Sequence, residues 1–197
     1  MAFQSRFQNL ARCVAECVYT CGDEVINEER ALEAAFQLLA EPRQRKGIVY
    51  VIGNGGSAGI ASHFSNDLMK ALQIPSQTFF DTNLLTCLAN DLGYENIFSY
   101  PLQHYLKPND LLVAISSSGK SPSIVKAAEI AITRQTPLIT LSGFQATNPL
   151  RQLGQLNFWI GRNDYGLVET AHFFLLHTIV DLWNEPSTSR VEYVQSR

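Results

Sequence analysis

The sequence predicts an α/β fold, in which a five-stranded parallel sheet is wound with helices on both faces and preceded by an N-terminal helical extension. Short apolar runs near residues 48, 77, 111, 137 and 156 alternate with longer segments of helical periodicity, which is the pattern of a parallel sheet. Two of these runs end in glycine- or serine-rich loops that lead into a helix. The 197 residues suffice for one such domain and are too few for two.

Composition narrows the class of protein. Charged residues make up 17% of the chain and hydrophobic residues 46%, against roughly 25% charged in an average soluble protein, so we expect an oligomer. The net charge is −3 without a basic run, which argues against nucleic acid as a direct partner. No apolar stretch approaches the roughly 20 residues of a membrane span, and the N-terminus lacks the apolar core of a signal peptide. We therefore expect a cytoplasmic protein without a membrane partner.

The first helix is predicted from apolar residues at alternating spacings of four and three. These residues are Phe3, Phe7, Leu10, Val14, Cys17 and Cys21. Such a heptad seam packs either on its own domain or against another subunit, and its position ahead of the first strand favours the second alternative. A second helix is predicted over 28–40. We expect residues 1–41 to serve in oligomerisation, 42–185 to form the main domain and 186–197 to be a polar tail.

The cysteines are predicted to be structural. Cys13, Cys17 and Cys21 recur every fourth residue along the expected helix, and Cys87 stands alone. This spacing matches no zinc or iron–sulfur motif, and thiols stacked on one helix cannot easily pair with one another. We expect reduced, buried cysteines that act as small hydrophobic residues.

The first loop follows the apolar strand 48–52 and precedes a predicted helix over 58–72. It consists of Gly53, Asn54, Gly55, Gly56 and Ser57. Its glycines let the backbone turn sharply and approach a ligand, and the N-terminus of the following helix attracts an anion. The loop therefore suits an anion, although a strand, a glycine turn and a helix also occur wherever a parallel sheet is wound.

The second loop follows the apolar strand 111–115 and reads Ser116, Ser117, Ser118, Gly119, Lys120 and Ser121. Several hydroxyls close together offer a phosphate rotatable donors without bulk. A serine-rich turn with an ordinary helix cap is the alternative. The parallel with the first loop favours phosphate, because ligands of such sheets bind beyond the carboxyl ends of the strands. The spacing of a Walker phosphate loop is absent, so nucleoside triphosphate hydrolysis is not indicated.

The remaining elements complete the sheet. We expect a strand over 77–80, helices over 83–89 and 97–106 that are separated by a break at 90–94, a helix over 123–134, strands over 137–141 and 156–160, and a closing helix over 167–183. Connections between parallel strands place these helices on both faces.

Two helices carry groups that could do chemistry. His63 and Asp67 lie four apart and share a helix face, so they could bind a metal, act as a base and its orienting group, or form a polar pair on a helix flank. The closing helix carries Glu169, His172 and His177. Glu169 and His177 are roughly 12 Å apart along the axis, which makes their joint ligation of one metal demanding. For His172 we favour a structural role.

Taken together, these motifs resemble the sugar isomerase (SIS) domain and, within it, the phosphoheptose isomerase family. They are the glycine loop, His63, Ala89-Asn90-Asp91, Ile115 with the serine loop, Glu169-Thr170-Ala171-His172 and His177. The resemblance covers nearly the whole chain. It implies a homotetramer that converts sedoheptulose 7-phosphate to D-glycero-D-manno-heptose 7-phosphate through an enediol, in lipopolysaccharide heptose biosynthesis.

The resemblance also implies roles for single residues. The phosphate would bind Ser57, Ser116, Ser117, Ser118 and Ser121, in a site completed by Gly55 and Gly56. Asn54 and Asp91 would face the sugar. Possible zinc ligands are His63, Asp67, Glu169 and His177. Asp67 and His177 would transfer the proton, with Glu169 as an alternative base.

Three positions depart from the family pattern. Asp67 replaces a glutamate, which sets the carboxylate back by about 1 to 1.5 Å, a shift that costs on the order of 100-fold in rate. Glu169 replaces a glutamine and could compensate for the shorter side chain of Asp67. Gly166 stands where an arginine is usual. A non-catalytic tetramer that binds a replication initiator, or a sugar-phosphate sensor, is therefore an alternative function. Retention of His63 and His177 favours the enzyme.

Overall fold

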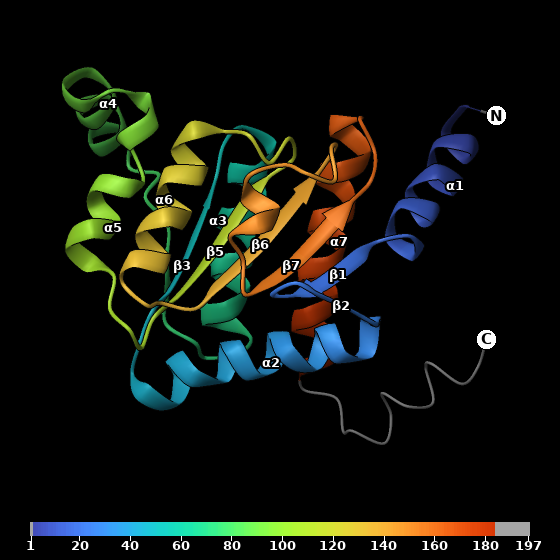
Figure 1. Ribbon diagram of the computed structural model, residues 1–197, viewed down its shortest axis with the longest axis horizontal. Coiled ribbons are helices and arrows are strands. Elements are labelled where there is room, and N and C mark those ends of the chain that lie inside the picture. Colours follow the sequence, from blue (N-terminus) through green and yellow to red (C-terminus); the bar gives the residue numbers. More distant parts are fainter. Residues whose placement is uncertain (1, 184–197) are drawn as a thin grey trace.

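The computed structural model describes residues 2–183, which form a sheet between two helical layers (Figure 1). In this part of the chain the sheet has seven strands in the order β2-β1-β7-β6-β5-β3-β4. The strands are β1 (Val18–Cys21), β2 (Glu24–Ile26), β3 (Val49–Gly53), β4 (Ser76–Gln77), β5 (Leu111–Ser116), β6 (Leu138–Gly143) and β7 (Leu156–Ile160). The five expected strands are β3 to β7, and all of their pairings are parallel. The predicted fold class is confirmed.

The helices cover both faces of the sheet. They are α1 (Ala2–Ala15), α2 (Glu28–Arg45), α3 (Gly56–Lys70), α4 (Thr82–Leu92), α5 (Ser99–Tyr105), α6 (Pro122–Thr133) and α7 (Tyr165–Trp183), with short 3₁₀ turns η1 (Tyr94–Asn96) and η2 (Leu150–Gln152). Successive strand residues point to opposite faces. Val51 and Val113 therefore pack with α1, α2, α3 and α7, whereas Ile52 and Ala114 pack with α4, α5 and α6.

The N-terminal segment differs from the prediction. The helix α1 ends at Ala15, and a β-hairpin of β1 and β2 follows, with β1 antiparallel to β7. Gly22 lies in the two-residue turn at φ +56°, as such hairpins require. The heptad seam was wrong beyond Val14, because Val18, Tyr19 and Thr20 suit a strand.

The outer part of α1 is uncovered in the single chain. Phe3 and Phe7 are 94% and 69% exposed, whereas Leu10 and Val14 pack against the core. In Figure 1, α1 lies at one end of the molecule, beside α7, and α4 and α5 lie at the opposite end. The expected contact between subunits stays a prediction.

The cysteine prediction is half right. All four cysteines are free, and Cys13 and Cys17 are buried. Cys21 and Cys87 are exposed, so the expectation of burial was wrong for these two. Cys21 lies in the edge hairpin rather than on a helix, and Cys87 lies on α4 with its Sγ 3.5 Å from Asp91 Oδ2.

Several helix and strand boundaries also differ from the predicted ones. The helix α2 continues through Pro42 to Arg45 rather than ending at 40, and Lys46 ends it at φ +56°. The helix α4 runs through most of the expected break at 90–94, and Gly93 ends it at φ +87°. Of the strand expected over 77–80, only residue 77 lies in a strand, because β4 consists of Ser76 and Gln77. The predicted tail over 186–197 lies outside the described residues. Within residues 2–183, no helix is both long and apolar enough to cross a bilayer.

Candidate functional site

The two predicted loops meet at one edge of the sheet. The strands β3 and β5 are neighbours, with Gly53 opposite Ile115, so the loops that follow them start side by side. Asn54 connects them, because its Nδ2 donates to Ser121 Oγ at 2.7 Å and to Ser123 Oγ at 2.9 Å. The expected proximity of the glycine loop and the serine loop is confirmed.

Tyr94 is a third contributor that sequence reasoning missed. Its hydroxyl donates to Asn54 Oδ1 at 3.0 Å, so the Asn54 amide is held at both ends. Nothing in the sequence around Tyr94 signals this contact, which arises because η1 returns toward the sheet edge. Asp91 is exposed, and in the described residues its hydrogen-bond partners are Asn90 and Cys87 rather than either loop. A role of Asn54 or Asp91 toward a sugar stays a prediction.

The glycine loop brings the first turn of α3 against Glu169, near the start of α7. Gly55 has φ +55°, a conformation that favours glycine. A Cβ on Gly56 would collide with the carboxylate of Glu169, so a glycine at this position lets the carboxylate lie against the loop. Glu169 therefore places a negative charge beside the start of α3, where the helix dipole favours it. Ser57 is buried in the same turn.

The serine loop contains a hydroxyl without a partner. Ser116 and Ser117 are buried, and Ser118 Oγ accepts a hydrogen bond from the Lys120 backbone N–H at 3.2 Å. Ser117 Oγ is enclosed and has no hydrogen-bond partner among the described residues. A buried polar group in this state costs about 1–3 kcal/mol. Such unsatisfied groups occur where a ligand is to be held, which agrees with the predicted phosphate loop.

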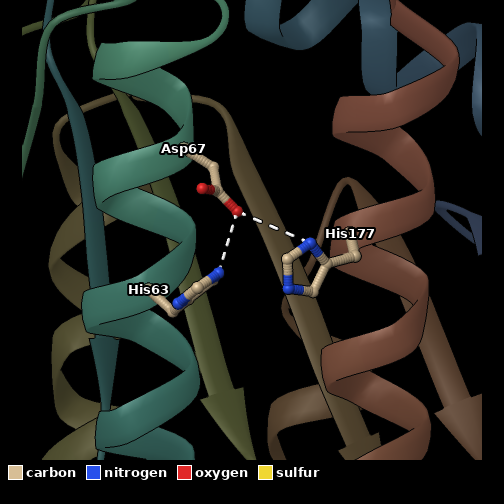
Figure 2. A group of neighbouring side chains, drawn as sticks. All are labelled: His63, Asp67 and His177. Carbon is tan, nitrogen blue, oxygen red and sulfur yellow. Dashed lines mark ion pairs between the residues drawn. The ribbon is translucent and has the colours of Figure 1, made fainter.

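The second part of the site lies between α3 and α7. Figure 2 shows Asp67 between two imidazoles, with His63 on its own helix and His177 on the neighbouring one. Asp67 Oδ2 lies 3.2 Å from His63 Nε2 and 3.6 Å from His177 Nδ1. The side chains of His63, Asp67 and His177 are 47%, 23% and 36% exposed, so ligands can reach them. We call these three residues the α3–α7 cluster.

Phe173 supports the α3–α7 cluster and was not predicted. Its ring packs edge-on against His63 and His177, at centroid distances of 5.1 and 4.6 Å. The two imidazole centroids lie 4.7 Å apart. Phe173 precedes His177 by one helical turn, so spacing along the helix was the signal that could have found it.

The donor set of the α3–α7 cluster fits a zinc ion. One ligand atom from each residue lies within 4.8 Å of the others, and imidazole nitrogens with a carboxylate oxygen are common zinc ligands. Donors of a tetrahedral zinc site lie about 3.3 Å apart, close to the two distances from Asp67. Three protein ligands leave a position open, as in catalytic sites. The group does not include Glu169, which lies against Gly56 instead.

His172 occupies a different environment on the same helix. It is fully buried, and its Nε2 donates to the carbonyl of Ser142 at 3.0 Å. Burial lowers its pKa to about 4, so the imidazole is neutral at pH 7. Its Nδ1 has no partner in the described part of the chain. This is the structural histidine that its sequence context indicated.

Comparisons with known proteins identify a family, relatives and solved structures to which this chain is similar. The model of the SIS domain family matches residues 16–143. The phosphoheptose isomerase of Campylobacter concisus is 32% identical over 168 residues, which cover 82% of this chain and 88% of the relative. The phosphoheptose isomerase of Shewanella denitrificans is 32% identical over 161 residues, 78% of this chain and 80% of the relative. The structure of phosphoheptose isomerase GmhA from Neisseria gonorrhoeae superimposes with a TM-score of 0.80 at 24% identity and covers 93% of this chain and 97% of that one. This structural likeness shows the shared fold.

Proposed function

Since the chain belongs to the SIS domain family and, within it, to the phosphoheptose isomerases, we propose that it converts sedoheptulose 7-phosphate to D-glycero-D-manno-heptose 7-phosphate. The observation that carries this proposal is the position of Asp67 Oδ2 between the imidazoles of His63 and His177, on helices that contact each other beside the phosphate loops. A base, an acid and an anion site are the parts that an aldose–ketose isomerase needs.

The length of the substrate supports an anion site at the loops and reacting groups at the α3–α7 cluster. His63 lies seven residues beyond Gly56, roughly 10 Å along α3. An extended chain advances about 1.2 Å per bond, so the eight bonds from phosphorus to the first carbon of a heptulose phosphate span about 10 Å. We therefore propose that the phosphate binds at the loops, through Ser57, Ser116, Ser117, Ser118 and Ser121 with the backbone of Gly55 and Gly56. The reacting carbons would lie at the α3–α7 cluster.

The reaction then follows from the residues present. The carboxylate of Asp67 takes the proton from the first carbon of the ketose, and His177 gives a proton to the carbonyl oxygen, which leaves the enediol. The Asp67 carboxylic acid returns its proton to the second carbon, and the hydroxyl on the first carbon returns a proton to His177. The aldose forms, and both residues are restored. Positioned groups of this kind contribute typically 10²- to 10⁴-fold each. Glu169, at the loop end of α7, is the alternative base.

We also propose a zinc site formed by His63, Asp67 and His177, with Glu169 as a fourth ligand if its side chain turns away from Gly56. A bound zinc would stabilise the negative charge that develops on the two substrate oxygens. Asp67 would then offer Oδ2 to the ion and keep Oδ1 for the substrate.

The surroundings of the site support further proposals. The exposed Phe3 and Phe7 on α1 favour contact with another copy, and we propose a homotetramer. We also propose a cytoplasmic location, with no membrane and no direct nucleic-acid partner, and a role in lipopolysaccharide heptose biosynthesis.

The proposal is tested by incubating the protein with sedoheptulose 7-phosphate and following the aldose by nuclear magnetic resonance. We expect aldose product from the wild type and strongly reduced product from Asp67→Asn. If the sugar phosphate raises the melting temperature without turnover, the protein is a sensor and the enzyme proposal fails. If neither effect is seen, the adaptor function replaces it.

A further inference from the structure

The segment between α4 and α5 is held against the start of α6. Gly93 ends α4 at φ +87°, and the 3₁₀ turn η1 follows directly. Lys126, on the second turn of α6, has its Nζ 3.5 Å from Glu95 Oε1 and 3.3 Å from Asn96 Oδ1. Because α6 begins directly after the serine loop, these two contacts bring Tyr94 to the loop.

The Asn54 amide connects Tyr94 to two serines. Its Oδ1 accepts a hydrogen bond from the Tyr94 hydroxyl at 3.0 Å. Its Nδ2 donates to Ser121 Oγ at 2.7 Å and to Ser123 Oγ at 2.9 Å. An amide nitrogen has two hydrogens to donate and accepts none. Both serine hydroxyls are therefore acceptors toward Asn54, and the hydrogen of each hydroxyl points elsewhere.

The two serines differ in what can reach them. Ser123 is fully buried, whereas Ser121 is partly exposed at the end of the serine loop. Within residues 2–183, the hydrogen bond from Asn54 is the only one that the Ser121 hydroxyl makes. A hydroxyl that accepts one hydrogen bond still has its own hydrogen to donate. The hydrogen of Ser121 is therefore available to a ligand at the loop.

The orientation of the Asn54 amide decides whether Ser121 can donate to that ligand. If the amide were flipped so that its oxygen and nitrogen exchanged places, Oδ1 would face the serines and accept their hydrogens. Ser121 would then offer a ligand only lone pairs. The Tyr94 hydroxyl opposes this flip, because a phenolic O–H is a stronger donor than a serine hydroxyl and binds the amide oxygen.

We propose that Tyr94 is a positioning residue, which acts through Asn54 to keep the Ser121 hydroxyl available as a donor to the bound sugar phosphate. This inference rests on the proposed function, in which Ser121 contacts the substrate, and it adds the segment between α4 and α5 to the site. The effect of Tyr94 falls on substrate binding and leaves proton transfer at the α3–α7 cluster unchanged.

The first test compares Tyr94→Phe with the matched control Tyr105→Phe. Tyr94 and Tyr105 are 57% and 56% exposed, and each variant loses one phenolic hydroxyl. We expect Tyr94→Phe to raise the KM for sedoheptulose 7-phosphate about fivefold with kcat unchanged, the size of a neutral hydrogen bond. Tyr105→Phe should match the wild type. An unchanged KM in Tyr94→Phe, or an equal rise in both variants, would overturn the inference.

A double-mutant cycle with Ser121→Ala separates positioning from a merely structural role. Without the Ser121 hydroxyl there is no donor for Tyr94 to orient, so Tyr94→Phe should leave the KM of Ser121→Ala unchanged. An equal rise in both backgrounds would show that Tyr94 acts independently of Ser121. That result would overturn the inference and leave the isomerase standing.

Calorimetric binding of sedoheptulose 7-phosphate distinguishes this inference from the proposed function. We expect the same pattern in the dissociation constants, whether or not the sugar is turned over. Binding that depends on Tyr94 only when Ser121 is present, without turnover, would remove the isomerase and leave the positioning role of Tyr94. A wild-type protein that does not bind the sugar phosphate would overturn both.

Discussion

Two sides of the helix α7 carry the same residue type in opposite environments. His172 points to the sheet, is fully buried, donates to the backbone of β6 and has its pKa lowered to about 4. His177, five residues later, points to α3 and faces Asp67 with its side chain 36% exposed. Burial rather than residue type therefore separates a neutral structural imidazole from one that a ligand can reach.

The largest expected effect comes from removing the imidazole on the side of α7 that faces α3. His177→Ala removes the proposed acid and should lower kcat about 1,000-fold, within the range for a general acid, without lowering the unfolding free energy appreciably. Turnover of sedoheptulose 7-phosphate and denaturant unfolding measure the two effects. His104→Ala is the matched control, because His104 is exposed on α5 and contacts the ring of Tyr100. Equal activity of His177→Ala and the control would contradict the assignment.

Removal of metal should affect the α3–α7 cluster, which lies on this same side of α7. Dialysis against a chelator is expected to lower kcat about 100-fold, as the several kcal/mol attributed to a metal that stabilises substrate charge imply, and added zinc should restore it. Metal analysis should find up to one zinc per chain in the wild type and little in His63→Ala, which loses one of the three donors. A metal-free preparation with full activity would show that the α3–α7 cluster works without an ion.

Replacement of His172, on the side of α7 that faces the sheet, should change how the unfolding free energy depends on pH. The folded pKa of His172, about 4, lies below its unfolded value near 6.5, so the unfolded chain takes up the proton first as the pH falls. His172 therefore destabilises the fold progressively from pH 6.5 to pH 4, by about 3 kcal/mol in total. In His172→Gln, whose amide can still donate to Ser142, this part of the acid destabilisation should be missing. Denaturant unfolding at pH 7 and pH 4 measures it, and an equal loss in both proteins would contradict the burial argument.

The smallest expected effect concerns the unpartnered hydroxyl of Ser117. Ser117→Ala removes a buried hydroxyl that has no hydrogen-bond partner within residues 2–183, so the unfolding free energy should stay level or rise by up to about 1 kcal/mol. The KM for the sugar phosphate should increase a few fold, because the loop loses a donor. Loss of stability in this variant would mean that Ser117 serves the fold rather than the ligand.

The sequence predicted those parts of the fold that local patterns determine. The apolar runs of β3, β5, β6 and β7 and the glycines and serines after β3 and β5 are signals within one segment. The hairpin of β1 and β2 was missed, because Cys17 and Cys21 continue the spacing of a helical seam. What decides the strand is pairing with β7, a contact over more than 130 residues.

The site residues also separate into those that local spacing predicts and those that only tertiary packing places. His63 and Asp67 were predicted as a pair because four residues make one helical turn. The approach of His177 depends on how α3 and α7 pack, and only the family resemblance indicated it. Tyr94 reaches Asn54 through a tertiary contact that no spacing encodes.

Exchange of carbon-bound hydrogen with solvent tests the α3–α7 cluster most directly. The protein is incubated with sedoheptulose 7-phosphate in deuterium oxide, and the sugar is followed by nuclear magnetic resonance. We predict deuterium at the second carbon of the aldose with the wild type, and a rate at least about 100-fold lower with Asp67→Asn. Exchange by Asp67→Asn at the wild-type rate would contradict the account and move the base to another residue, with Glu169 the first to examine.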